Sequence, residues 1–158
     1  YQKTGQTEQA ITYYQQSIEI SRQIGDKRNE GLIVGNLGNV FITINRWEEA
    51  EQYLTQAIGI CQKNFSVAAG IFYGSLSLIY SHQQKIDIAL ETLGRGEPLV
   101  EDSPLEHGKF LCKKAQVLHL AQQPKAAKEA LKQARTINVE EDSELPKAIT
   151  EAEQFLSS

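Results

Sequence analysis

The chain has 158 residues, of which 41% are hydrophobic and 23% are charged, and its formal net charge is −4. Lysine and arginine are scattered along the sequence, which argues against a nucleic-acid platform, because such proteins usually carry a basic face. The sequence holds no run of 18 apolar residues, and its polar opening lacks the apolar core of a signal peptide. We therefore expect a cytoplasmic protein that binds neither nucleic acid nor membrane.

Apolar residues at helical spacing predict helices throughout, arranged in antiparallel pairs. The first long helix covers 6–24. Gly25 is expected to end this helix in a left-handed conformation, and Asp26 to cap the next one. The following pair covers 28–44 and 46–62 and turns at Asn45, a residue type that tolerates a positive φ.

Two further pairs follow, and then a single helix: 66–83 with 85–100, 103–121 with 123–137, and finally about 143–157. Ser103 and Glu106 are expected to form a capping box around Pro104. Ser143 marks the start of the last helix. Two glycines and Pro98 inside 85–100 are expected to kink that helix or to end it early.

A pattern of large and small residues recurs along the chain. Each unit has an alanine that follows a large residue by nine positions, precedes another large residue by four, and precedes a small residue by seven. The alanines are Ala10, Ala50, Ala89 and Ala127, so the pattern returns at a nearly constant interval. Tyr1 is the large residue of the first unit. Such a period with helical spacing inside each unit predicts a solenoid, a fold that works by presenting a binding surface.

The second repeat reads Asn36-Leu37-Gly38-Asn39-Val40-Phe41, then Arg46-Trp47-Glu48-Glu49-Ala50-Glu51-Gln52-Tyr53-Leu54, and ends in Ala57-Ile58. This unit resembles the tetratricopeptide repeat. The period of about 40 residues is longer than the usual one of this family. It is similar to the long variety found in kinesin light chains and bacterial signalling proteins. The closing segment is similar to the C-terminal ends of large bacterial regulators, so the chain resembles the C-terminal part of a longer array.

The resemblance implies an all-α, right-handed superhelical solenoid of antiparallel helix pairs with a C-terminal capping helix. About three and a half repeats would occupy 1–137, and a linker and capping helix 138–158. Ile149, Ala152 and Leu156 would face the core from this last helix, and Glu151, Gln154 and Ser157 would form its polar outer face.

In such arrays the first helix of each pair lines a concave groove. The residues expected to bind a peptide there are Leu32, Asn36, Asn39, Ile71, Ser75, Leu78, Lys109, Lys113 and Gln116. An asparagine amide donates and accepts hydrogen bonds, so Asn36 and Asn39 can pair with a peptide backbone. The alternative is that both amides bind neighbouring helices or water.

Lys109 and Lys113 are four residues apart and therefore share a helix face. The resemblance to chaperone-binding arrays implies that they could hold a carboxylate, which favours an acidic peptide partner. Gly35 and Ser75 depart from the lysine and asparagine that a full carboxylate clamp would have. The alternative for the two lysines is an ordinary solvated face.

The sequence contains no recognised catalytic or phosphate-binding motif, and we expect neither enzymatic activity nor a cofactor. His82, His107 and His119 lack the spacing of a metal site. Cys61 and Cys112 are expected to be reduced thiols, with a disulfide as the alternative.

The sequence thus predicts a non-catalytic scaffold that binds a peptide or protein segment in the concave groove. The alternative is a self-assembly or intramolecular regulatory segment of a larger bacterial signalling protein. For that alternative, the apolar stripe of helix 6–24, which includes Ile11 and Tyr14, would lack a partner and would support self-association.

Overall fold

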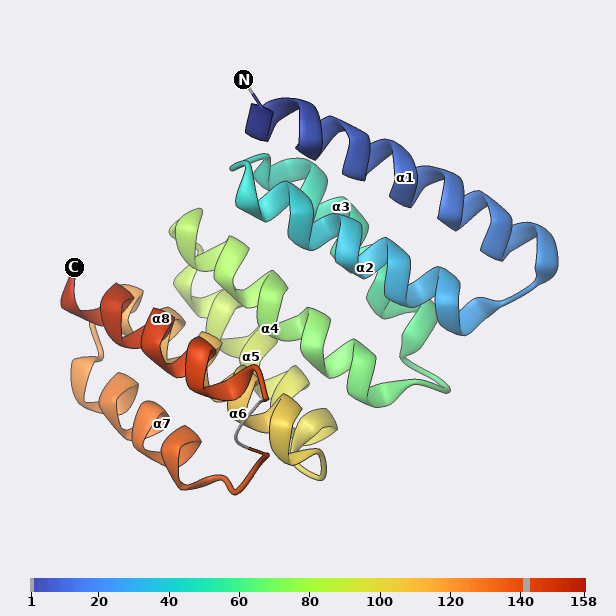
Figure 1. The fold of residues 1–158 in the computed structure, drawn as a ribbon. Coiled ribbons are helices and arrows are strands. Elements are labelled where there is room, and N and C mark those ends of the chain that lie inside the picture. Colours follow the sequence, from blue (N-terminus) through green and yellow to red (C-terminus); the bar gives the residue numbers. More distant parts are fainter. Residues whose placement is uncertain (1, 141–142) are drawn as a thin grey trace. The chain divides into compact units, whose positions relative to one another are not determined.

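A computed structural model describes residues 2–140 and 143–158. Tyr1, which the repeat pattern assigns to the first repeat, therefore lies outside the described residues. The described residues are helical and contain no strand (Figure 1). Their helices are α1 (Gln2–Ile24), α2 (Lys27–Thr43), α3 (Trp47–Cys61), α4 (Ser66–His82), α5 (Ile86–Val100), α6 (Pro104–Leu120), α7 (Pro124–Thr136) and α8 (Leu145–Ser157). The predicted all-α class of neighbouring helix pairs is confirmed.

The chain divides into two compact units, one ending at Phe72 and the other beginning at Tyr73, so the boundary falls inside α4. In the first unit, α2 and α3 form an antiparallel hairpin with Leu37, Phe41 and Leu54 in its core. A Cβ atom on Gly38 would lie 2.8 Å from Cγ of Leu54, so the missing side chain permits close approach of the two helices.

The turn between α1 and α2 is fixed by its own polar groups. Gly25 has the expected positive φ, 73°, and the backbone N–H of Asn29 donates to Oδ1 of Asp26 at 3.1 Å. Next to this cap, Nε of Arg22 and Nζ of Lys27 donate to the two carboxylate oxygens of Glu30, at 2.8 and 2.7 Å. The predicted glycine stop and aspartate cap are therefore both confirmed.

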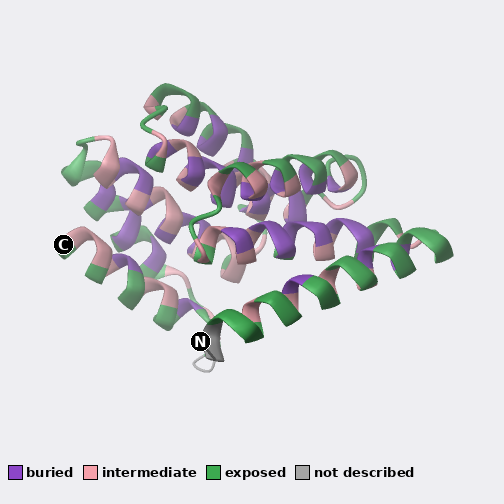
Figure 2. Cartoon of the chain, turned by 90° about the horizontal axis from the view of Figure 1, so that it is seen from above, coloured by how far each residue is buried: buried purple, intermediate pink, exposed green. Residues whose placement is uncertain are grey.

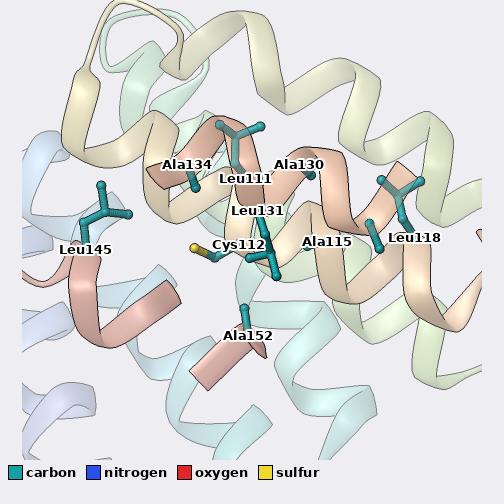
Figure 3. Close-up of a cluster of buried hydrophobic side chains, with 10 residues drawn as sticks. Leu111, Cys112, Ala115, Leu118, Ala130, Leu131, Ala134, Leu145 and Ala152 are labelled. Carbon is teal, nitrogen blue, oxygen red and sulfur yellow. The ribbon is translucent and has the colours of Figure 1, made fainter. Parts of the chain in front are cut away.

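One cluster of buried side chains in the second unit is formed by α6, α7 and α8. It contains Leu111, Cys112, Ala115, Leu118, Ala127, Ala130, Leu131, Ala134, Leu145 and Ala152, most of them labelled in Figure 3. A Cβ atom on Gly108 would lie 2.7 Å from both methyl groups of Leu145. The absence of a side chain on α6 therefore provides the notch into which the first residue of α8 packs.

Three hairpins turn on a non-glycine residue with positive φ. These residues are Asn45 (58°), Gln84 (60°) and Gln122 (59°), one in each of three successive hairpins. The turn at Asn45 was predicted from the asparagine. Glutamine gives no comparable signal, so the other two turns follow from their equivalent places in the hairpins.

Several local predictions differ from the structure. α5 continues through Gly94, Gly96 and Pro98 to Val100, so it does not end early, and the alternative of a kink stays a prediction. Pro98 lies only two residues before the helix end, where the loss of one backbone hydrogen bond has little effect. α1 begins at Gln2, earlier than the predicted residue 6, because the polar residues there carry no apolar periodicity.

The predictions at two serines were right only in part: α6 begins directly after Ser103, its N-cap residue, but without the predicted capping box, and α8 begins two residues after Ser143. Ser103 makes no capping hydrogen bond with its side chain, and the carboxylate of Glu106 instead lies 3.8 Å from Nζ of Lys109. α8 begins at Leu145, and the hydroxyl of Ser143 has no hydrogen-bond partner among the described residues. Pro104 does occupy the start of α6, as expected.

Candidate binding pocket of the second unit

A pocket of about 420 Å³ lies among α4, α6 and the start of α8, within the second unit. It is lined by Leu78, Lys109, Cys112, Lys113, Gln116, Glu144, Lys147, Ala148 and Glu151. α6 contributes the largest share, since residues three and four apart share a helix face. The opposite face of α6 buries Leu111, Ala115 and Leu118 in the core, and this packing holds the pocket-facing side chains in place.

Lys113 is a half-buried cation whose hydrogen-bond partner is uncharged. Its Nζ atom donates to Oγ of Ser75, a fully buried hydroxyl on α4, at 2.9 Å. No carboxylate of the described residues lies within 4.0 Å of this nitrogen. Burial, with a smaller contribution from the positive charge of Lys109, lowers the pKa of Lys113 to about 8. The site therefore holds an ammonium group that its surroundings stabilise poorly.

Lys109 lies one helical turn away and is well paired. Its Nζ donates to Oε2 of Glu144 at 2.8 Å, and Glu106 lies 3.8 Å away. Burial lowers the pKa of Lys109, but the hydrogen bond to Glu144 and the attraction of Glu106 outweigh this effect, so the pKa is raised overall. Lys109 remains charged across the physiological range.

The pocket lining carries one more cation than anions. It contains the lysines Lys109, Lys113 and Lys147 and the glutamates Glu144 and Glu151. Glu144 pairs with Lys109, and Glu151 lies 3.9 Å from Lys147 on the exposed side of α8. Lys113 is thus the lining cation without a carboxylate among the described residues, which makes the pocket suited to one negative group.

The structure brings together some of the residues predicted to bind a peptide. Leu78, Lys109, Lys113 and Gln116 line the pocket, and Ser75 lies beneath it as the partner of Lys113. The other four predicted residues, Leu32, Asn36, Asn39 and Ile71, belong to the first unit and do not line this pocket. Of these, Asn36 is exposed and the others are half-buried. Their role in binding stays a prediction.

Sequence reasoning missed the contribution of α8. Glu144, Lys147, Ala148 and Glu151 line the pocket, whereas Glu151 was placed on an outer face. The available signal was their spacing of three to four residues, which places them on one helix face. Spacing alone does not tell which neighbour that face meets, because the docking depends on the notch at Gly108.

Other candidate chemistry is absent from the part of the chain that the structure describes. No group of three histidine, cysteine or acidic side chains there could hold a metal ion. Cys61 and Cys112 are both free and buried. Burial raises the pKa of the Cys112 thiol to about 11, which makes it unreactive. No helix of the described residues is both long and apolar enough to cross a membrane.

The fold and the pocket define a helical-repeat protein. Residues 1–63 match the family described as tetratricopeptide repeat. A solved structure titled "Crystal structure of BtubC (BKLC) from P. vanneervenii" is similar, with a TM-score of 0.68 and 20% sequence identity. The similarity covers 87% of this chain but only 58% of that one, so this chain spans little more than half of that protein. Among curated proteins, no sequence matches.

Residues 1–63 are therefore similar to the tetratricopeptide repeat family, and the likeness of fold to the solved structure extends over most of the chain. Repeats of this family generally mediate protein–protein interactions. The long-repeat variety stays a prediction.

Proposed function

We propose that this chain is a non-catalytic scaffold that binds an acidic peptide or protein segment in the pocket among α4, α6 and α8. The observation that carries the proposal is Lys113, an ammonium group in the pocket wall bonded to the hydroxyl of Ser75 without a carboxylate partner. A charge removed from water without a counterion is costly, and a ligand carboxylate would supply one.

The remaining lining residues fit a peptide ligand. Gln116 offers an amide that can donate to and accept from a backbone, while Leu78 and Ala148 supply apolar contact. The volume of about 420 Å³ falls in the range of about 300–1,000 Å³ typical of ligand pockets. This space accommodates a few side chains of a peptide, so a longer partner would place only part of itself there.

The test is binding to an array of short peptides in which each acidic peptide is matched by one with glutamine in place of glutamate. Lys113→Met is expected to weaken binding of the acidic members at least about tenfold, since a charged hydrogen bond in a desolvated site is lost. Lys132→Met changes an exposed lysine of α7 and is the matched control, with binding within about twofold of wild type.

Two results would contradict the proposal. One is equal binding of the acidic and glutamine peptides. The other is unchanged binding by Lys113→Met, provided that its circular dichroism spectrum and unfolding midpoint show an intact fold.

A second candidate function is self-association through α1. Tyr13, Ile20 and Ile24 are 68%, 57% and 71% exposed and lie at helical spacing on one side of this helix, as the exposed colouring of α1 in Figure 2 illustrates. Ile11 and Ile18 are buried on the other side, where α1 packs against α2, and Tyr14 is half-buried, so the prediction that the stripe through Ile11 and Tyr14 lacks a partner was wrong. A second copy of the chain could cover the exposed apolar face. Sedimentation equilibrium of wild type and Ile20→Lys tests this, and a monomer at all concentrations excludes it.

A further inference from the structure

The ion pair between Lys109 and Glu144 joins the pocket wall to the segment that leads into α8. The two residues lie 35 positions apart, and Nζ of Lys109 donates to Oε2 of Glu144 at 2.8 Å. A carboxylate from a distant part of the chain therefore already occupies one of the two lysines expected to bind an acidic ligand. The chain supplies, from within, the chemical group that the pocket is suited to bind.

We propose that Glu144 is an internal competitor for acidic ligands, which holds Lys109 and limits the pocket to one free cation until a ligand displaces it. This inference rests on the proposed function and concerns the regulation of the same pocket.

The Glu144 side chain is placed where it can leave. It is 76% exposed, whereas that of Lys109 is 29% exposed. An ion pair with one highly solvated partner contributes little to stability, because water replaces the contact at small cost. A ligand carboxylate that also meets Lys113 can therefore compete for Lys109.

The neighbouring residue keeps α8 in place during such an exchange. Leu145 is 2% exposed and packs into the notch left by Gly108. Ala152, further along α8, is fully buried in the same core. The carboxylate of Glu144 can thus move away while the helix that follows it remains docked, so the exchange needs only a side-chain rotation and no unfolding.

The pocket would therefore offer a ligand either one lysine or two, depending on the position of the Glu144 side chain. With Glu144 in place, a ligand with one carboxylate meets Lys113. With Glu144 displaced, Lys109 keeps only the longer contact to Glu106 at 3.8 Å, and Lys109 and Lys113 face the ligand together from one side of α6, four residues apart. A ligand with two neighbouring carboxylates gains both lysines only by displacing Glu144, and its affinity is reduced by that competition.

The experiment compares Glu144→Gln with Glu151→Gln on the same peptide array. Both changes remove one negative charge from the pocket lining, but only Glu144 bonds to Lys109. We expect Glu144→Gln to bind peptides with two neighbouring acidic residues about threefold to tenfold more tightly than wild type, and to gain more than Glu151→Gln, which removes the same charge from the lining but leaves the ion pair of Lys109 intact. Peptides with a single acidic residue should gain less from Glu144→Gln than those with two.

A readout without ligand is the rate at which an amine-reactive reagent labels Lys109, followed by peptide mass spectrometry. Removing the Glu144 carboxylate lowers the pKa of Lys109 and exposes its amine, so labelling of Lys109 should rise several-fold in Glu144→Gln and stay unchanged in Glu151→Gln. Unchanged labelling in Glu144→Gln would overturn the inference, since Glu144 would then not hold Lys109 in solution.

The binding results separate the two proposals. If wild type binds acidic peptides and Glu144→Gln binds them no more tightly, the internal competitor is wrong and the proposed function stands. Equal tightening by both variants also overturns it, since net charge would explain the gain. If neither wild type nor Glu144→Gln prefers acidic peptides, the proposed function fails and the inference fails with it.

Discussion

Each of the two units holds a charged group at least partly shielded from water, Glu30 buried and Lys113 half-buried, and the two groups have opposite surroundings. In the first unit, the carboxylate of Glu30 is 5% exposed and accepts from both Arg22 and Lys27. In the second unit, Lys113 donates only to the hydroxyl of Ser75 among the described groups. The charge with two counterions joins α1 to α2, whereas the charge of Lys113 has no carboxylate partner among the described residues. The fold thus neutralises the first charge and leaves the second without a counterion, which is the basis of the function proposed above.

The pKa values differ in the same sense. Hydrogen bonds from Lys27 and Arg22 hold the pKa of Glu30 below its ordinary value despite its burial. Burial instead lowers the pKa of Lys113 to about 8, so its surroundings disfavour its charge. The first unit stabilises its buried ion, and the second destabilises one.

A second contrast concerns how tightly each unit packs at one repeat position. Gly35 and Gly74 occupy equivalent places in successive repeats, and each faces a phenylalanine, Phe72 or Phe110. A Cβ on Gly35 would lie 2.0 Å from the ring of Phe72, whereas one on Gly74 would lie 3.1 Å from Phe110. There is therefore no space for a Cβ atom between glycine and phenylalanine in the first unit, and only a little in the second.

The largest expected change in the free energy of unfolding tests this difference in packing. Gly35→Ala should lower the free energy of unfolding by about 3 kcal/mol, because the new methyl group overlaps a buried aromatic ring. Gly74→Ala should change it by less than about 1 kcal/mol, since a small shift relieves the contact and alanine favours the helix. Urea unfolding followed by circular dichroism measures both. Equal losses would show that the two positions pack alike.

The next effect tests the paired charge. Glu30→Gln should lower the free energy of unfolding by about 2 kcal/mol at pH 7, because two charge-assisted hydrogen bonds are lost. The lowered pKa means that Glu30 stabilises the fold above the carboxyl's ordinary pKa, and that this contribution is lost as pH falls through the folded-state pKa. The difference between wild type and Glu30→Gln should therefore shrink at acidic pH. A pH-independent difference would contradict the ion-pair explanation.

The smallest effect has the opposite sign and tests the unpaired charge. Lys113→Met should raise the free energy of unfolding by about 1 kcal/mol at pH 7, because an apolar side chain of similar length replaces a poorly stabilised ion. Between pH 8 and the ordinary lysine value of 10.5, the unfolded wild type binds more protons than the folded one, so its stability should rise with pH.

That rise should be absent from Lys113→Met, and unfolding curves at pH 7, 8.5 and 9.5 measure it. A destabilised Lys113→Met at pH 7 would mean that the lysine is structural after all, and the contrast with Glu30 would be lost.

Much of the fold follows from the sequence, because period and turn chemistry act locally. Most helix ends fall within two residues of their predicted positions, and Gly25, Asp26 and Asn45 perform their expected roles. Helix α5 shows the limit of such local rules. Pro98 disfavours a helix by itself, yet the helix runs past it to Val100, because Pro98 lies near the helix end and the burial of Gly96 and Val100 around it outweighs propensity.

The site was predictable only in part, for a similar reason. Helical spacing placed Lys109 and Lys113 on one face, and the structure keeps them there. Helical spacing could not place Glu144 beside Lys109, because a contact between residues so far apart in the sequence depends on how α8 docks. Nor could helical spacing show that Lys113 is half-buried beside Ser75, since that contact joins two helices that are distant in the sequence.

The notch at Gly108 also limits how α8 can be transferred to another protein. α8 fits this unit because the receiving helix lacks one side chain where Leu145 packs. A transplant of α8 onto another helical array therefore needs a glycine at the matching place in the recipient. The portability of this terminal helix is determined by the surface that receives it, and redesign should start from α6.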